Sequence, residues 1–168
     1  MNRALFSIAI RFCMLIFVQV VVFNEIDFLG AYDPLIAILF LLLYPVNSDQ
    51  FSFLIVSFFF GLSLDLFLMS GGVQACSFLV AAFARPTILR FTFGVSYDYH
   101  DINIRESSVP QQLNALGLLV LCHHTIMYSL IAFSWSRFLW IIERTLVNGI
   151  FTIVICFMLF YLIKKNGK

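Results

Sequence analysis

Long runs of apolar residues dominate the chain, and short polar stretches separate them. A helix needs about 20 apolar residues to cross the hydrocarbon core of a bilayer. Because the runs do not alternate and most exceed the length of about 10 residues typical of membrane strands, they predict helices. Six runs are candidate spans: Ala4–Phe23, Pro34–Val46, Phe51–Leu68, Val73–Leu89, Leu113–Trp135 and Trp140–Ile163.

The first two runs differ from ordinary spans, the first in its position at the N-terminus and the second in its length. No small-x-small cleavage site follows Ala4–Phe23, so we interpret it as a retained span and not as a signal peptide. Pro34–Val46 is short for an upright span. It is either a tilted span extended by its neighbours or a re-entrant segment, and the number of spans is then six or five.

The composition supports a membrane protein. Hydrophobic residues make up 62% of the chain and charged residues 11%, against about 25% charged in typical soluble domains. We therefore expect an all-α integral membrane protein with about six transmembrane helices, built as one polytopic domain over residues 1–168. The net charge of +1 gives no argument for a nucleic-acid partner, and the four cysteines, all in apolar runs without CxxC spacing, read as free thiols.

The distribution of Lys and Arg predicts the orientation. With six spans, Arg137 lies on one side of the membrane. The long polar segment at about residues 91–112 falls on the other side, together with both termini. That side carries Arg3, Arg85, Arg90, Arg105, Lys164, Lys165 and Lys168. Positive residues favour the cytoplasm, so we expect cytoplasmic termini and a cytoplasmic loop at 91–112.

Asp65 is the most informative polar residue within a run. A charged side chain at the centre of a membrane helix costs about 2.5–3.5 kcal/mol on insertion scales. Ser57, Gly61 and Asp65 are spaced four apart and share one helix face, and Ser57 with Gly61 forms a small-xxx-small pair. This face is either a packing and partner-recognition surface anchored by Asp65, or Asp65 is an interfacial carboxylate that touches water.

Other polar residues favour structural roles. Pro86 predicts a kink, and Arg85 beside it either reaches lipid headgroups or contacts a partner. His123 and His124 point about 100° apart on a helix, so we expect hydrogen bonds between helices and no metal site. Without a GxSxG, HExxH, Walker or dinucleotide motif, we expect neither enzymatic activity nor a cofactor.

Two neighbouring segments carry a family resemblance. Gly61–Phe67 reads GLSLDLF, and Gly71–Ala75 reads GGVQA. This pattern resembles the rod shape-determining protein MreD family, and Ala84-Arg85-Pro86 before a polar loop resembles its Bacteroidetes-type members. The motif part covers roughly residues 58–89, and the whole chain is similar in hydropathy pattern. Family members often have Gly-x-His or Gly-x-Asn in the turn, whereas this chain has Gly72-Val73-Gln74.

The resemblance implies a non-enzymatic subunit of the cell-wall elongation complex in the bacterial inner membrane, which helps to maintain rod shape. Its expected partners are membrane lipid, a bitopic MreC-like protein and, indirectly, MreB and the peptidoglycan synthases. The loop from Arg90 to Arg105 would make contacts below the membrane. The expected packing or partner face comprises Ser57, Gly61, Asp65, Gly72, Arg85 and Pro86.

A second interpretation is the substrate-binding S component of an energy-coupling-factor vitamin transporter, a fold to which MreD-like proteins look related. Such a subunit needs a polar or aromatic pocket near the outer face. The residues available there are sparse: Glu25, Asp27, Asp33, Asp65 and Trp135.

Overall fold

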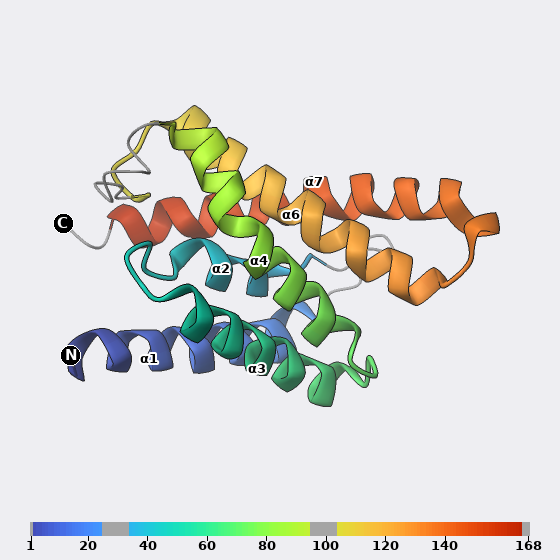
Figure 1. Cartoon of the computed structure of the whole chain (residues 1–168), viewed down its shortest axis with the longest axis horizontal. Helices are drawn as coiled ribbons and strands as arrows, with labels where there is room; N and C mark the ends of the chain where they lie inside the picture. Colours follow the sequence, from blue (N-terminus) through green and yellow to red (C-terminus); the bar gives the residue numbers. More distant parts are fainter. Residues whose placement is uncertain (1, 25–33, 95–103, 166–168) are drawn as a thin grey trace.

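A computed structural model describes residues 2–24, 34–94 and 104–165, and this part of the chain is helical without strands (Figure 1). Glu25, Asp27 and Asp33, considered above for a pocket near the outer face, lie outside the described residues. The elements are α1 (Asn2–Val18), a π-helix (Gln19–Phe23), a 3-10 helix (Ile36–Ile38), α2 (Leu39–Leu43), α3 (Gln50–Leu68), α4 (Val73–Phe93), α6 (Val109–Ala132), a 3-10 helix (Trp135–Arg137) and α7 (Phe138–Lys165).

Five helical segments of the described chain are long and apolar enough to cross a membrane, which confirms an all-α, multi-pass membrane protein. They are Phe6–Phe23, Gln50–Leu68, Val73–Phe93, Val109–Ala132 and Trp135–Leu162. Pro34–Val46 is not among them. Its helical part has three 3-10 residues and the five residues of α2. These rise about 13 Å together, less than half of the roughly 30 Å core.

The short segment nevertheless belongs to a six-pass path. In Figure 1, α1 and α3 both run away from the end of the bundle where α1 begins, so the chain between them must return to that end. We call this end, where α7 also finishes, the near end. The opposite end, with the turns at 69–72 and 133–137, is the far end. The return explains how α1 begins and α7 finishes on the same side although five helices of the described residues have spanning length.

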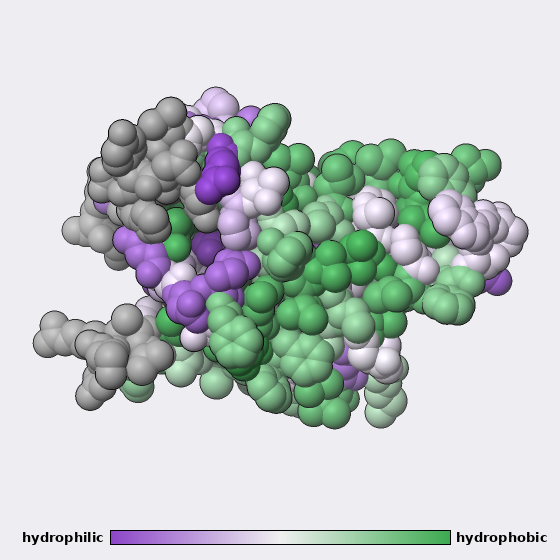
Figure 2. Space-filling model, in the orientation of Figure 1, coloured by the Kyte–Doolittle hydropathy of each residue, from purple (hydrophilic) through white to green (hydrophobic). Residues whose placement is uncertain are grey.

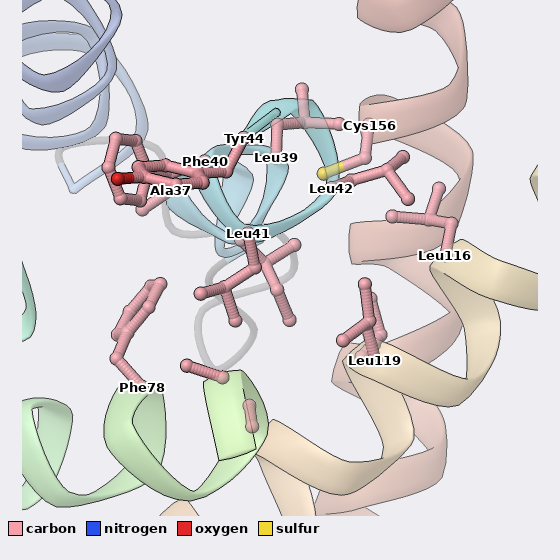
Figure 3. Close-up of a cluster of buried hydrophobic side chains, with 14 of the residues drawn as sticks. Ala37, Leu39, Phe40, Leu41, Leu42, Tyr44, Phe78, Leu116, Leu119 and Cys156 are labelled. Atoms are coloured by element: carbon pink, nitrogen blue, oxygen red, sulfur yellow. The ribbon is translucent and has the colours of Figure 1, made fainter. Parts of the chain in front are cut away.

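α2 lies at the centre of the bundle and not against lipid. Figure 3 shows Phe78 of α4, Leu116 and Leu119 of α6, and Cys156 of α7 around it. Residues 35–42 are almost completely buried, and Phe40 stacks on Phe60 of α3 at 4.3 Å between ring centroids. A helix that is apolar all round is a buried helix, which accounts for a run that is too short to span but apolar throughout.

The start of this segment is not helical, although it lies deep in the bundle. Backbone polar groups inside a membrane need partners from the protein. The Gln19 side chain accepts a hydrogen bond from the Ala37 N–H at 3.2 Å and donates to the Pro34 carbonyl at 3.3 Å. The Thr152 hydroxyl of α7 accepts from the Leu35 N–H at 3.1 Å. Gln19 therefore interrupts an apolar run because it satisfies the backbone of the return segment.

The predicted loop at 91–112 is shorter in the structure. α4 continues to Phe93, and α6 begins at Val109, so the prediction placed both helix ends wrongly. At the start of α6 the cause is a capping box: Ser108 and Gln111 bond reciprocally, with Pro110 in the first turn. The polar composition of this first turn made it look like loop.

The outer surface of the long helices is apolar. Large hydrophobic side chains are exposed on α1, α3, α4, α6 and α7, and the face in Figure 2 is mostly hydrophobic away from the near end. Contiguous exposed apolar surface of this extent is unusual for soluble monomers and is what a lipid solvent requires.

Candidate functional site

Asp65 joins α3 to the beginning of α4. Its carboxylate accepts hydrogen bonds from the backbone N–H groups of Gln74 at 2.9 Å and Ala75 at 2.8 Å, and from the Ser70 hydroxyl. Only 6% of Asp65 is exposed. A carboxylate at this position satisfies N–H groups that have no partner within the helix and complements the helix dipole. Asp65 is therefore a buried cap of α4, and the water-exposed alternative is wrong.

The junction between α3 and α4 requires glycine at two positions, Gly72 and Gly61, for different reasons. Gly72 precedes α4 with a φ of 94°, a conformation that favours glycine, and its own side chain can supply no cap. A Cβ atom on Gly61 would lie 2.7 Å from both the Ala75 Cα and the Gln74 carbonyl oxygen. The two helices thus touch at the same residues that Asp65 caps.

Ser57, Gly61 and Asp65 are all buried, as expected for one packing face of α3. Ser57 is completely buried, and its hydroxyl has no hydrogen-bond partner within the described part of the chain. The face packs within the chain, and contact of this face with a partner stays a prediction.

Arg85 points into the protein and not toward lipid headgroups, so the expected membrane anchor is wrong. Its guanidinium donates to the carbonyls of Tyr44 and, at 3.5 Å, Leu42, and lies 4.8 Å from the centre of the Phe53 ring. From α1, Arg11 donates to the intervening Leu43 carbonyl at 2.7 Å. Two arginines therefore bind three successive carbonyls at the end of α2, where the helix leaves these acceptors without partners.

Pro86 leaves one backbone carbonyl of α4 without its usual donor, and another helix supplies a donor in its place. Proline lacks the N–H that would bond the carbonyl four residues earlier, here that of Ala82. The side-chain amide of Gln50, the first residue of α3, donates to this carbonyl at 3.4 Å. α4 continues through Pro86 as far as Phe93, so the proline creates a contact between two helices.

A small recess lies beside these arginines at the near end. It has a volume of about 110 Å³ and is lined by residues 42–46, Ile104 and Arg105. The Gln112 side chain donates to the Ile104 and Ser107 carbonyls, both at 3.0 Å, and so fixes the segment that carries Arg105. Figure 2 shows strongly hydrophilic residues gathered at this end. We call this site the near-end recess.

A polar cluster occupies the interior between α4, α6 and α7. His124 contacts the Thr152 hydroxyl at 3.3 Å, which confirms a hydrogen bond between helices for this residue. For His123 the prediction is wrong, because its ring nitrogens have no hydrogen-bond partner within the described residues and its ring lies 4.6 Å from the Phe78 ring between centroids. The amide of Asn148 donates to the Tyr128 hydroxyl. The described residues contain no group of three or more His, Cys, Asp or Glu side chains suited to a metal ion.

A larger, mostly apolar groove of about 610 Å³ opens between α6 and α7 at the far end, where the hairpin extends beyond α3 and α4 in Figure 1. Trp135 on its rim is 90% exposed. The groove is lined by Leu121, Thr125, Ser129, Phe133, Ser134, Trp135, Phe138, Ile141, Ile142, Thr145 and Leu146. Its composition suits hydrocarbon and offers little for catalysis.

Comparison of the chain with protein-family models, with curated proteins and with solved structures finds no match.

The contacts that were not predicted from the sequence include Arg11 with Leu43, Gln19 with Pro34, and Gln50 with Ala82. Arg11 and Gln19 gave a signal, because polar residues within apolar runs are costly and need partners. The missing information was that a non-helical segment would lie against them.

Proposed function

We propose that this chain is a non-enzymatic membrane subunit of a bacterial cell-wall elongation complex, similar to MreD proteins. It would bind a bitopic MreC-like protein in the inner membrane and connect through it to MreB and the peptidoglycan synthases. Its termini would be cytoplasmic, because the end with α1's start and α7's finish carries most of the positive residues.

One observation carries this proposal: the segments that resemble the family form a single structural unit. Gly61 and Asp65 come from GLSLDLF, and Gly72, Gln74 and Ala75 come from GGVQA. In the structure Asp65 caps the helix that Gly61 touches. A motif whose residues meet at one helix junction specifies a rigid α3–α4 hairpin, which suits a protein that presents helix faces to a partner.

The burial and the contacts of the polar residues also fit a scaffold. The Asp65 carboxylate accepts hydrogen bonds from the beginning of α4, and His123 is completely buried against Phe78. These groups have structural neighbours and are not exposed to a substrate. The accessible surface of the described long helices is largely apolar and therefore suited to contacts inside the bilayer.

The first experiment is purification of the tagged full chain from native membranes in mild detergent, followed by mass spectrometry. Recovery of an MreC-like protein with wall synthases is expected. A photo-crosslinking residue at Phe59, which is 55% exposed on α3, tests direct contact, and one at the fully buried Phe60 is its matched control. Recovery without elongation proteins, in repeated preparations, would contradict the proposal.

The polar cluster gives specific support to one alternative, a vitamin-binding S component. Gln74, His123, His124 and Asn148 supply polar side chains between three helices. Vitamins added to the detergent-purified chain should raise its unfolding temperature if this role is correct, because a ligand stabilises by RT ln(1 + [L]/Kd). Recovery of an ATPase pair with a coupling subunit in the purification would support the same alternative.

A further inference from the structure

The far part of the α6–α7 hairpin projects beyond α3 and α4 (Figure 1). The Gln74 side chain, in the first turn of α4, contacts the Met127 sulfur at 3.5 Å, and Asn148 of α7 bonds to Tyr128. Residues 128–147 therefore lie past the level at which α4 begins. The groove of about 610 Å³ lies largely in this projecting part, and all its lining residues come from α6, α7 and the turn that joins them. We call it the far-end groove.

The walls of the far-end groove are continuous with the surface that contacts lipid. Leu121 of α6 and Ile142 and Leu146 of α7 line the groove and are also exposed on the apolar outer face of the long helices. Trp135 lies on the rim, and tryptophan is enriched at the level of lipid headgroups. The groove thus opens to the hydrocarbon of the surrounding leaflet.

The floor of the far-end groove is polar. Among the lining residues Thr145 is the buried one, with 5% of its surface exposed, and its hydroxyl has no hydrogen-bond partner within the described residues. Thr125, which lines the groove from α6, differs because its hydroxyl bonds to the Leu121 carbonyl of its own helix. A buried hydroxyl without a partner raises the free energy of the protein, and no water is present in the bilayer core to satisfy it. An acceptor that enters the groove would remove this cost.

We propose that the far-end groove binds one ester-linked membrane lipid, with an acyl chain along its apolar walls and an ester carbonyl that accepts a hydrogen bond from Thr145. The volume of about 610 Å³ lies within the range of about 300–1,000 Å³ typical of ligand pockets. A lipid ester presents a free carbonyl directly on an apolar chain. The backbone carbonyls of a partner helix are already bonded within that helix, so a helix suits the site less well. This inference is independent of the elongation role.

The test uses the purified full chain, stripped of lipid in a neutral detergent. Short-chain phosphatidylcholine with ester-linked chains and its ether-linked analogue, which lacks the carbonyls, are titrated separately, and the unfolding temperature gives an apparent Kd. The wild type should bind the ester lipid about fivefold more tightly, the ratio that corresponds to one neutral hydrogen bond. Thr145→Val retains the shape of the side chain without its hydroxyl and should bind both lipids equally. Thr145→Ser retains the hydroxyl and should keep the preference for the ester.

Matched controls separate the groove from the rest of the lipid-facing surface. Thr125→Val removes a groove hydroxyl that is bonded within α6 and should keep the wild-type preference. Ser129→Trp fills the groove and should abolish saturable binding of both lipids. Ile150→Trp places the same side chain at an exposed position of α7 outside the groove and should bind as the wild type does. Should Ser129→Trp fail to fold, Leu121→Trp on the same wall replaces it.

The lipid-free variants provide a second measurement. Thr145→Val should unfold at the same temperature as the wild type or a higher one, because it removes a buried hydroxyl that has no partner. A lower temperature would show that the hydroxyl is bonded within the chain and would overturn the assignment. Equal preference for the ester lipid in the wild type and Thr145→Val would do the same. If Ser129→Trp leaves lipid binding unchanged but removes a co-purifying protein, the groove binds that protein and the lipid site is wrong.

Discussion

The backbone N–H of Ala75 donates a 2.8 Å hydrogen bond to the carboxylate of Asp65, ten residues earlier and on the preceding helix. This bond places the end of α3 against the first turn of α4, where Gly61 allows the backbones to touch. The carboxylate that seemed suited to partner recognition consequently holds two helices of its own chain together. Loss of function on its removal would not by itself reveal a partner surface.

Replacing Asp65 by Ala should destabilise the chain by about 2–4 kcal/mol, because a helix cap is lost and buried N–H groups are left without acceptors. Asp65→Asn keeps one acceptor oxygen and should lose less. Unfolding in detergent with increasing denaturant measures both. Ser63→Ala is the control, since the Ser63 hydroxyl bonds only to the Phe59 carbonyl of its own helix in the described structure. Equal stability of the Asp65→Ala variant and this control would show that the cap contributes nothing.

Replacing Gly61 by Ala should cost about 1–3 kcal/mol through overpacking, because the new Cβ would meet backbone atoms at 2.7 Å. Gly117→Ala is a matched change in α6, where the Cβ would lie 3.8 Å from the Ile153 Cδ1 atom. Alanine has the better helix propensity, so the control should be neutral or slightly stabilising. Thermal unfolding of both variants in one detergent gives the comparison, and a stable Gly61→Ala variant would refute the close approach.

The bond from Gln50 to Ala82 predicts a coupling with Pro86. In the wild type, Gln50→Ala leaves the Ala82 carbonyl without its side-chain donor, at a cost of about 1 kcal/mol. In a Pro86→Ala background the restored N–H bonds this carbonyl, so the same change should cost little. A double-mutant cycle on unfolding free energies measures the coupling. Strictly additive effects would mean that Gln50 does not compensate for the proline.

Thr152→Val should destabilise the return segment by about 1–3 kcal/mol, because the Leu35 N–H loses its acceptor inside the bundle. Thr125→Val is the control, since the Thr125 hydroxyl bonds the Leu121 carbonyl of its own helix at an exposed position. Hydrogen exchange should increase at residues 35–37 in the first variant alone. Unchanged exchange there would contradict the role assigned to Thr152.

The sequence predicted the long helices well because lipid imposes a simple rule of length and apolarity. It also predicted the shared face of Ser57, Gly61 and Asp65, which follows from helical spacing. It did not predict the direction of Arg85, because the acceptors at Leu42 and Tyr44 exist only after α2 has ended inside the bundle. Contacts to carbonyls depend on the path of the backbone and leave no pattern in residue types.

For Pro34–Val46, too, the sequence alone does not predict which surroundings the segment has. An apolar run indicates apolar surroundings, and both lipid and a bundle centre provide them. Length argued against a full span, and the polar residues Gln19 and Thr152, which bond the segment, lie in other helices. Only the three-dimensional arrangement connects these residues to the segment.

The turns at the two ends of the bundle give a test of the orientation. Asn47 lies in the turn at the near end and Ser136 in the turn at the far end, and both are exposed. Single cysteines are introduced by Asn47→Cys and Ser136→Cys after the exposed Cys13 and Cys76 are replaced by Ala. A membrane-impermeant maleimide added to intact spheroplasts should label the Ser136→Cys variant only, and Asn47→Cys should become reactive after permeabilisation. This pattern follows from a cytoplasmic near end. The reverse pattern would invert the proposed orientation, and labelling of both from outside would mean that α3, α4 and α6 do not all cross the membrane.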